Sequence, residues 1–153
     1  MTELRLRHFS SLACERRYHA PVRIGAIAAG WLTDLGLSLL FFMVLAGIVG
    51  GEGASPEDVA RRMNGSVELM VSTLLVGLAF TGIGGYVAAT LAKQKHIQHA
   101  VAVGLLSLGL GISTLGAGGP SSQPAWLTLA GIALTLPFAA FGGYYRQQTE
   151  KQP

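Results

Sequence analysis

Residues 24–49 read IGAIAAGWLTDLGLSLLFFMVLAGIV, an apolar run that contains one charged residue, Asp34. A helix needs about 20 consecutive apolar residues to cross a membrane core, so this run is long enough to span it. Three further runs have the same character, at residues 67–92, 97–117 and 125–145. Because lipid offers no hydrogen-bond partner to a free backbone group, each run is predicted to be helical. The sequence therefore predicts an all-α transmembrane four-helix bundle.

The composition agrees with this prediction. The chain has 153 residues, of which 50% are hydrophobic and only 12% are charged, whereas a soluble domain usually has about 25% charged residues. We divide it into a basic arm (residues 1–23), a four-span membrane domain (24–145) and a short tail (146–153).

The positive charges lie in alternate connecting segments, which predicts the orientation of the spans. Residues 50–66 and 118–124 contain only Arg61 and Arg62, so we expect these two loops outside the cell. Both termini are expected in the cytoplasm, and membrane lipids, not nucleic acid, are the expected partner of the basic residues. The other nine Lys and Arg residues all fall on the cytoplasmic side of this topology: Arg5, Arg7, Arg16, Arg17, Arg23, Lys93, Lys95, Arg146 and Lys151.

The first outer loop contains a helix-start pattern, which predicts a short surface helix at residues 56–64. Ser55 is the expected N-cap, Pro56 the first helical residue, and Asp58 stands three positions after the cap. Opposite charges four residues apart are expected to neutralise one another along this helix, pairing Glu57 with Arg61 and Asp58 with Arg62.

The second and fourth spans share a motif at an offset of 58 residues. If this is a true duplication, the bundle consists of two tandem two-helix repeats related by an axis along the membrane normal. The alternative is the general abundance of Gly and Ala in membrane helices. The motif pairs Leu78, Phe80, Gly84, Gly85 and Tyr86 with Leu136, Phe138, Gly142, Gly143 and Tyr144.

Both of these spans also carry a small residue or a threonine at every fourth position. Apolar side chains gain little by leaving lipid for one another, so membrane helices associate where small residues let their backbones approach. These faces are therefore predicted to pack closely against other helices, through Gly77, Gly85 and Ala89 in the second span and Gly131, Ala139 and Gly143 in the fourth.

Asp34 is the candidate site residue. It lies 11 positions after Arg23, well inside the first span, where a carboxylate costs about 2.5–3.5 kcal/mol on insertion scales. Its helix face also carries Ala26, Gly30 and Ser38, so we expect it to face another helix. Thr81, at nearly the same depth, and Tyr86 are candidate hydroxyl donors. One reading is a proton or cation site; the other is a hydrogen-bonded acid that only locks two helices together.

No catalytic pattern accompanies this acid, and we expect neither an enzyme nor a cofactor. The sequence has no phosphate-binding loop, no Ser-His-Asp arrangement and no paired intramembrane carboxylates. His96 and His99 stand three apart at the start of the third span, but a histidine pair without a Cys or a nearby carboxylate is a weak metal ligand set. We therefore predict no metal site.

The segment Gly84-Gly85-Tyr86-Val87-Ala88-Ala89, followed by a basic loop and by residues 99–106, resembles a pattern in small four-span bacterial membrane proteins, including the YrzE-like group. There a Gly-Gly-aromatic end of span two is followed by His-Gly or His-Ala at the start of span three. The resemblance covers about 25 residues and implies a bundle in the bacterial inner membrane. It implies no function, because that group has none assigned.

Two functions are compatible with these features. The first is a non-enzymatic scaffold or accessory subunit that packs through its Gly and Ala faces against itself, as a homo-oligomer, or against a larger membrane complex. The alternative is a minimal homo-oligomeric transporter or channel that uses Asp34 as its proton or cation site.

Overall fold

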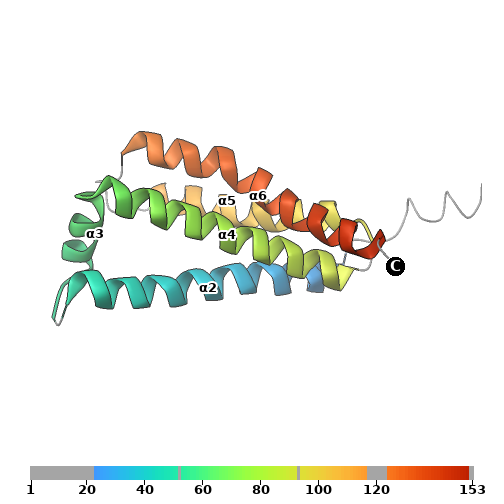
Figure 1. Cartoon of the computed structure of the whole chain (residues 1–153), viewed down its shortest axis with the longest axis horizontal. Coiled ribbons are helices and arrows are strands. Elements are labelled where there is room, and N and C mark those ends of the chain that lie inside the picture. Colours follow the sequence, from blue (N-terminus) through green and yellow to red (C-terminus); the bar gives the residue numbers. More distant parts are fainter. Residues whose placement is uncertain (1–22, 52, 93, 117–123, 152–153) are drawn as a thin grey trace, which may run out of the picture.

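The computed structural model describes residues 23–51, 53–92, 94–116 and 124–151. Most of the basic arm, most of the second outer loop and the end of the tail lie outside these residues. The described part is all-helical, and four of its helices are long and apolar enough to cross a membrane. Figure 1 shows them side by side, with a short helix at one end. The helices are α2 (Ile24–Gly50), α3 (Pro56–Asn64), α4 (Val67–Ala92), α5 (His96–Gly116) and α6 (Ala125–Lys151).

The helix boundaries follow the apolar runs closely, except at the end of α6. The sequence predicted a fourth span ending at residue 145, whereas the helix continues to Lys151. The added residues are polar but contain no breaker, and Arg, Gln, Glu and Lys all favour helix. Within this extension Gln148 donates a hydrogen bond of 2.5 Å to the Tyr144 hydroxyl one turn earlier. The helix is therefore longer than the apolar run from which it was predicted.

The short helix α3 begins as its sequence predicted. The Ser55 hydroxyl accepts a hydrogen bond from the Asp58 backbone N–H, and the Asp58 carboxylate accepts one from the Ser55 backbone N–H. These bonds satisfy backbone donors that the first helical turn leaves without a partner. The hydrogen bonds from the Ser55 side chain and backbone hold the pKa of the Asp58 carboxyl below its ordinary value.

The charges of α3 pair differently from the expectation. Asp58 contacts Arg61 at 3.4 Å, and Arg62 turns away to donate to the carbonyls of Val49 and Gly50, at 3.0 and 3.1 Å. These carbonyls end α2, whose last turn has no basic residue of its own. A cation there stabilises the negative end of the helix dipole and satisfies carbonyls that the helix leaves without a donor. Arg62 therefore fastens α3 to the end of α2.

At the end of the bundle opposite α3, the helices are packed through glycines. A Cβ atom added at Gly30 of α2 would lie 2.5 Å from the Gly84 carbonyl oxygen of α4. At Gly85 it would lie 2.6 Å from the Ala139 carbonyl of α6, and at Gly143 it would lie 2.7 Å from the Ala100 Cβ of α5. Such distances are far inside van der Waals contact, so only glycine permits these approaches.

Toward α3 the helices separate. Figure 1 shows α2, α4 and α6 close together near the C-terminal end and spread apart at the end where α3 lies. The Phe41 and Phe80 rings still meet edge to face there, with centroids 5.8 Å apart, and connect α2 to α4. The bundle thus has one tightly packed half and one open half.

The two copies of the repeated motif share some contacts and differ in others. Gly84 packs on α2, whereas its counterpart Gly142 packs on Gly82 of α4. Gly85 and its counterpart Gly143 both lie against the Ala100 Cβ of α5, at 3.3 and 2.7 Å from an added Cβ. The two-fold repeat therefore stays a prediction from the sequence.

Candidate functional site

Asp34 lies in the middle of the bundle, on the face of α2 that meets α4. It is 4% exposed. Its position follows from the helix period, because Gly30, one turn earlier, brings α2 against the α4 backbone and turns the next residue of that face inward. A Cβ atom at Gly84 would lie 2.9 Å from the Asp34 Cβ, so α4 contacts the base of the acidic side chain.

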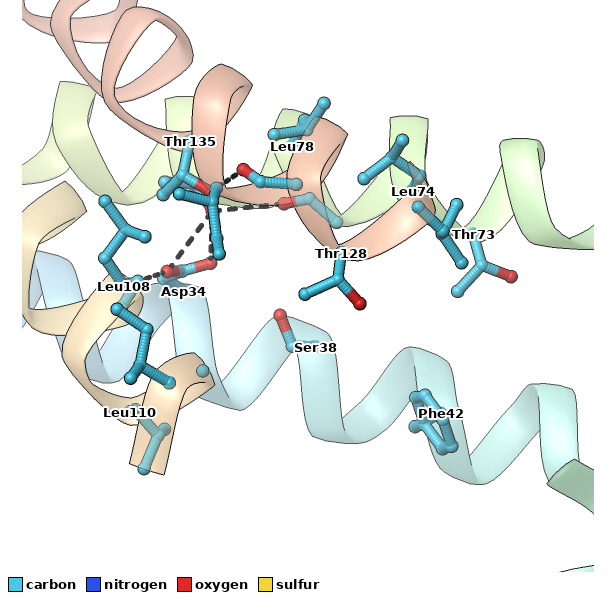
Figure 2. Close-up of a pocket in the computed structure, with 18 of the residues that line it drawn as sticks. Asp34, Ser38, Phe42, Thr73, Leu74, Leu78, Leu108, Leu110, Thr128 and Thr135 are labelled. Carbon is cyan, nitrogen blue, oxygen red and sulfur yellow. Dashed lines mark hydrogen bonds between the residues drawn. The ribbon is translucent and has the colours of Figure 1, made fainter. Parts of the chain in front are cut away.

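Two hydroxyl groups surround the carboxylate. The Thr81 hydroxyl on α4 lies 3.3 and 3.4 Å from its two oxygens, and the Ser107 hydroxyl on α5 donates to Oδ2 at 2.5 Å (Figure 2). Asp34 thereby links three helices.

The Asp34 carboxylate can accept more hydrogen bonds than the described residues around it donate. A threonine hydroxyl has one proton, and that of Thr81 is also directed at the Gly77 carbonyl, 3.2 Å away. When Thr81 donates to Gly77, Ser107 is the only described residue that donates to Asp34. The described residues that line the surrounding space include no Lys, Arg or His, so no cationic side chain there balances an ionised Asp34. A proton or a bound cation can supply the missing charge.

Asp34 lies at the inner end of a cavity of about 650 Å³ between the separated halves of the helices. Ser38 and Phe42 follow Asp34 at four-residue steps and form the α2 wall, as Figure 2 shows. Met63 and Asn64 of α3 border the far end. Apart from Leu35 of α2, the remaining lining residues come from α4, α5 and α6, and the polar ones among them are Thr73, Thr81, Ser107, Thr128 and Thr135.

The small-residue faces are divided between packing and cavity. Gly85, Ala89, Ala139 and Gly143 are buried at helix contacts in the tight half. Close packing does not hold at Gly77, where an added Cβ would meet nothing within 4 Å.

At Gly131 the nearest atom to an added Cβ is a leucine methyl at 3.7 Å. Gly77 and Gly131 line the cavity instead. The physical reason is the separation of the helices, which carries the outer part of each face away from its neighbour.

Tyr86 is not part of the site. It is 37% exposed, and its ring lies beside that of Tyr145, with centroids 6.2 Å apart. Thr81 and Tyr86 are five residues apart, which places them about 140° apart around α4. If Thr81 faces α2, Tyr86 therefore cannot.

Ser107 was not among the predicted site residues, although it makes the shortest hydrogen bond to Asp34. A signal was present: Ser107 lies 11 residues after His96, the first residue of α5, as Asp34 lies 11 residues after Arg23. Both residues are therefore about 16 Å from the same end of the bundle, at 1.5 Å per residue.

The two histidines of α5 hold the helix ends together. The His99 Nε2 atom accepts from the Arg23 backbone N–H at 3.0 Å, so its Nδ1 carries the proton and donates to the Lys95 carbonyl at 3.1 Å. His96 contacts the Ala89 carbonyl at 2.7 Å and the Glu150 carboxylate at 2.8 Å, two acceptors that an imidazolium satisfies together. Among the residues that the structure describes, no group of three or more metal-ligating side chains occurs.

Known proteins give no further guidance. No family model matches the chain, and neither a curated protein nor a solved structure does so. The resemblance to small four-span bacterial proteins therefore stays a prediction.

Proposed function

We propose that this chain is an integral membrane transporter or channel subunit that binds a proton or a cation at Asp34. The observation that carries this proposal is a buried intramembrane acid at the end of an open cavity. An acid that only locked two helices together would need no such space. Intramembrane ionisable residues are costly and most often mark ion or substrate pathways.

The orientation belongs to the same proposal. With both termini in the cytoplasm of a bacterium, as the distribution of Lys and Arg predicts, the cavity faces the outside and the glycine-packed half faces the cytoplasm. The subunit then takes its ligand from the outer side, and passage across the membrane requires the glycine contacts beneath Asp34 to separate.

The first test compares two acid-to-amide variants in liposomes that contain a pH-sensitive or a Na⁺-sensitive dye. Under an imposed potential, we expect the wild-type chain to carry a proton or Na⁺ flux that Asp34→Asn reduces at least tenfold. Glu68→Gln is the matched control, because Glu68 is an exposed acid in the first turn of α4 and does not line the cavity. Equal flux in wild type and Asp34→Asn would refute the proposal.

A second measurement needs no variant and so does not depend on the folding of Asp34→Asn. Dicyclohexylcarbodiimide reacts with protonated carboxyl groups in apolar surroundings, and mass spectrometry locates the product. We expect modification of Asp34 in the wild-type chain and slower modification as pH or Na⁺ concentration rises. No modification at Asp34 under any of these conditions would count against a site that exchanges ions.

A scaffold or accessory role is the second candidate, and one observation favours it. In the apolar stretch of α2, 6% of the residues are buried, whereas 17–33% of the residues are buried in the apolar stretches of the other three spans. Gly36 and Gly47 on α2 have nothing within 4 Å of an added Cβ. A homo-oligomer or larger complex would therefore use α2, since the faces of Gly85 and Gly143 are occupied inside the chain. Gly36→Leu should then abolish chemical crosslinking between copies in membranes, and unchanged crosslinking would exclude this face.

A further inference from the structure

The cavity at Asp34 has a definite chemical character, which narrows its ligand. We propose that it binds a monovalent organic cation with an apolar body, a ligand class that rests on the transporter proposal and specifies it.

The charge in the cavity favours a monovalent cation. Asp34 is the only ionisable residue among the described residues that line the cavity. One carboxylate in apolar surroundings attracts one positive charge and repels anions, since Coulomb interactions are strong at low dielectric. Divalent ions are disfavoured, because Ca²⁺ takes six to eight oxygen ligands and Mg²⁺ keeps several waters. The hydroxyls of Thr81 and Ser107 with one carboxylate offer far fewer.

The volume and the apolar walls of the cavity favour an organic ligand over a bare ion. A volume of about 650 Å³ falls in the range of about 300–1,000 Å³ that is typical of sites for drug-sized molecules, and it far exceeds the need of a bare ion. Away from Asp34 the walls are mainly apolar. The apolar lining residues include Leu35, Phe42, Met70, Leu74, Leu108 and Ile132.

The order of side chains along α2 fits a ligand with a charged end and an apolar end. Asp34, Ser38 and Phe42 share one wall, so charge, hydroxyl and aromatic ring succeed one another outward from the inner end. A ligand with its cation at Asp34 places its apolar part beside Phe42, which lies eight residues, about 12 Å, further along α2. Binding removes the uncompensated charge without placing a second polar group against the apolar walls.

On the side of Asp34 that faces away from α3, close packing of α2 and α4 limits how far a ligand can enter. Gly30 and Gly84 bring the backbones of α2 and α4 into contact there. Between these two helices, the described residues therefore close the cavity on the side of Asp34 that faces away from α3. A bulky cation therefore stops at Asp34, and its charge replaces the proton that the empty site would hold.

The experiment measures protection of Asp34 from dicyclohexylcarbodiimide in the purified full chain. Tetraphenylphosphonium is the probe, and tetraphenylborate, of the same shape and opposite charge, is its control. We expect the phosphonium to slow modification of Asp34 at least tenfold and saturably, and the borate to leave it unchanged. Equal protection by both ions would overturn the proposal, because it would reflect size or detergent partition and not charge.

Two glycine variants test the volume requirement. Gly77→Leu places a side chain in the cavity beside Thr81 and keeps the carboxylate, since an added Cβ at Gly77 meets no atom. It should raise the phosphonium concentration for half-protection at least tenfold, while protection by Na⁺ stays as in the wild type. Gly109→Leu is the matched control, because Gly109 is exposed, has nothing within 4 Å and does not line the cavity.

The outcomes separate the two proposals. If Asp34-dependent flux or Na⁺ protection is present and the phosphonium gives no protection, the organic-cation proposal fails and the transporter proposal stands. If Asp34 is neither modified nor required for flux, both fail. Unchanged phosphonium protection in Gly77→Leu also overturns the organic-cation proposal, since the ligand would then not occupy the cavity.

Discussion

Single hydroxyl groups decide the chemistry around Asp34. Ser107 and Thr81 approach its carboxylate from two different helices, and Thr81 divides its one proton between the acid and its own helix backbone. A threonine one turn away from a carbonyl commonly makes such a bond to its own helix. The acid is thus held in place without being fully supplied with donors, which suits a site that gains and loses a positive charge.

At the same scale, Asp58 predicts a pH dependence for α3. Its pKa in the folded protein lies below the unfolded value, chiefly because the Ser55 hydroxyl and backbone N–H donate to it. A depressed pKa stabilises the fold above the unfolded pKa, about 3.9, and that stabilisation is lost as pH falls through the lower folded value. Below about pH 4, amide hydrogen exchange in α3 should therefore accelerate relative to α4. In Asp58→Asn the acceleration should be absent; its persistence would assign it to another group.

At the scale of elements, each small-residue face serves two purposes along its length. On α4 the face passes from Gly77 in the cavity wall to Gly85 at a backbone contact, and on α6 it passes from Gly131 to Gly143. The same spacing therefore joins the helices in one half and leaves space between them in the other.

The difference between the packed half and the open half predicts unequal effects of Gly-to-Ala changes in the two halves. In Gly142→Ala the new methyl would overlap the Gly82 carbonyl oxygen, so α4 and α6 must move apart. Overpacking of this kind typically costs about 1–3 kcal/mol. In Gly77→Ala the methyl meets nothing within 4 Å, and stability should stay within about 0.5 kcal/mol of the wild type. Unfolding in detergent, followed by circular dichroism, measures both, and equal losses would contradict the described packing.

At the scale of the whole molecule, one end of the bundle is fastened and the other is open. The start of α2, the start of α5 and the end of α6 meet at the fastened end, where His99 holds Arg23 and His96 holds Glu150 (Figure 1). At the other end α3 connects α2 to α4, through its own chain and through Arg62. If the helices tilt about the fastened end, their other ends move furthest. Such a movement would therefore mainly change the volume of the cavity.

The membrane orientation is testable at this scale. A fluorescent protein fused after Pro153 should fluoresce in the cytoplasm, and alkaline phosphatase fused after Gly65 should be active outside. This outcome follows because the fastened end carries the excess of positive charge, which resists translocation. Phosphatase activity from a fusion after Pro153 would show the opposite orientation, in which the cavity faces the cytoplasm.

Local patterns were sufficient for much of this description. The four spans, the start of α3 at Ser55 and the inward direction of Asp34 follow from apolar length, capping chemistry and the helix period, all of which act within a few residues of one chain segment. The contact of Ser107 with Asp34 and the separate roles of Gly77 and Gly85 required the tertiary structure. They depend on which helices are neighbours and how far these separate along their length, and that is set by contacts between residues far apart in the sequence. The pairing of Arg62 with the end of α2 belongs to the same class, because the carbonyls it satisfies lie 12 and 13 residues away.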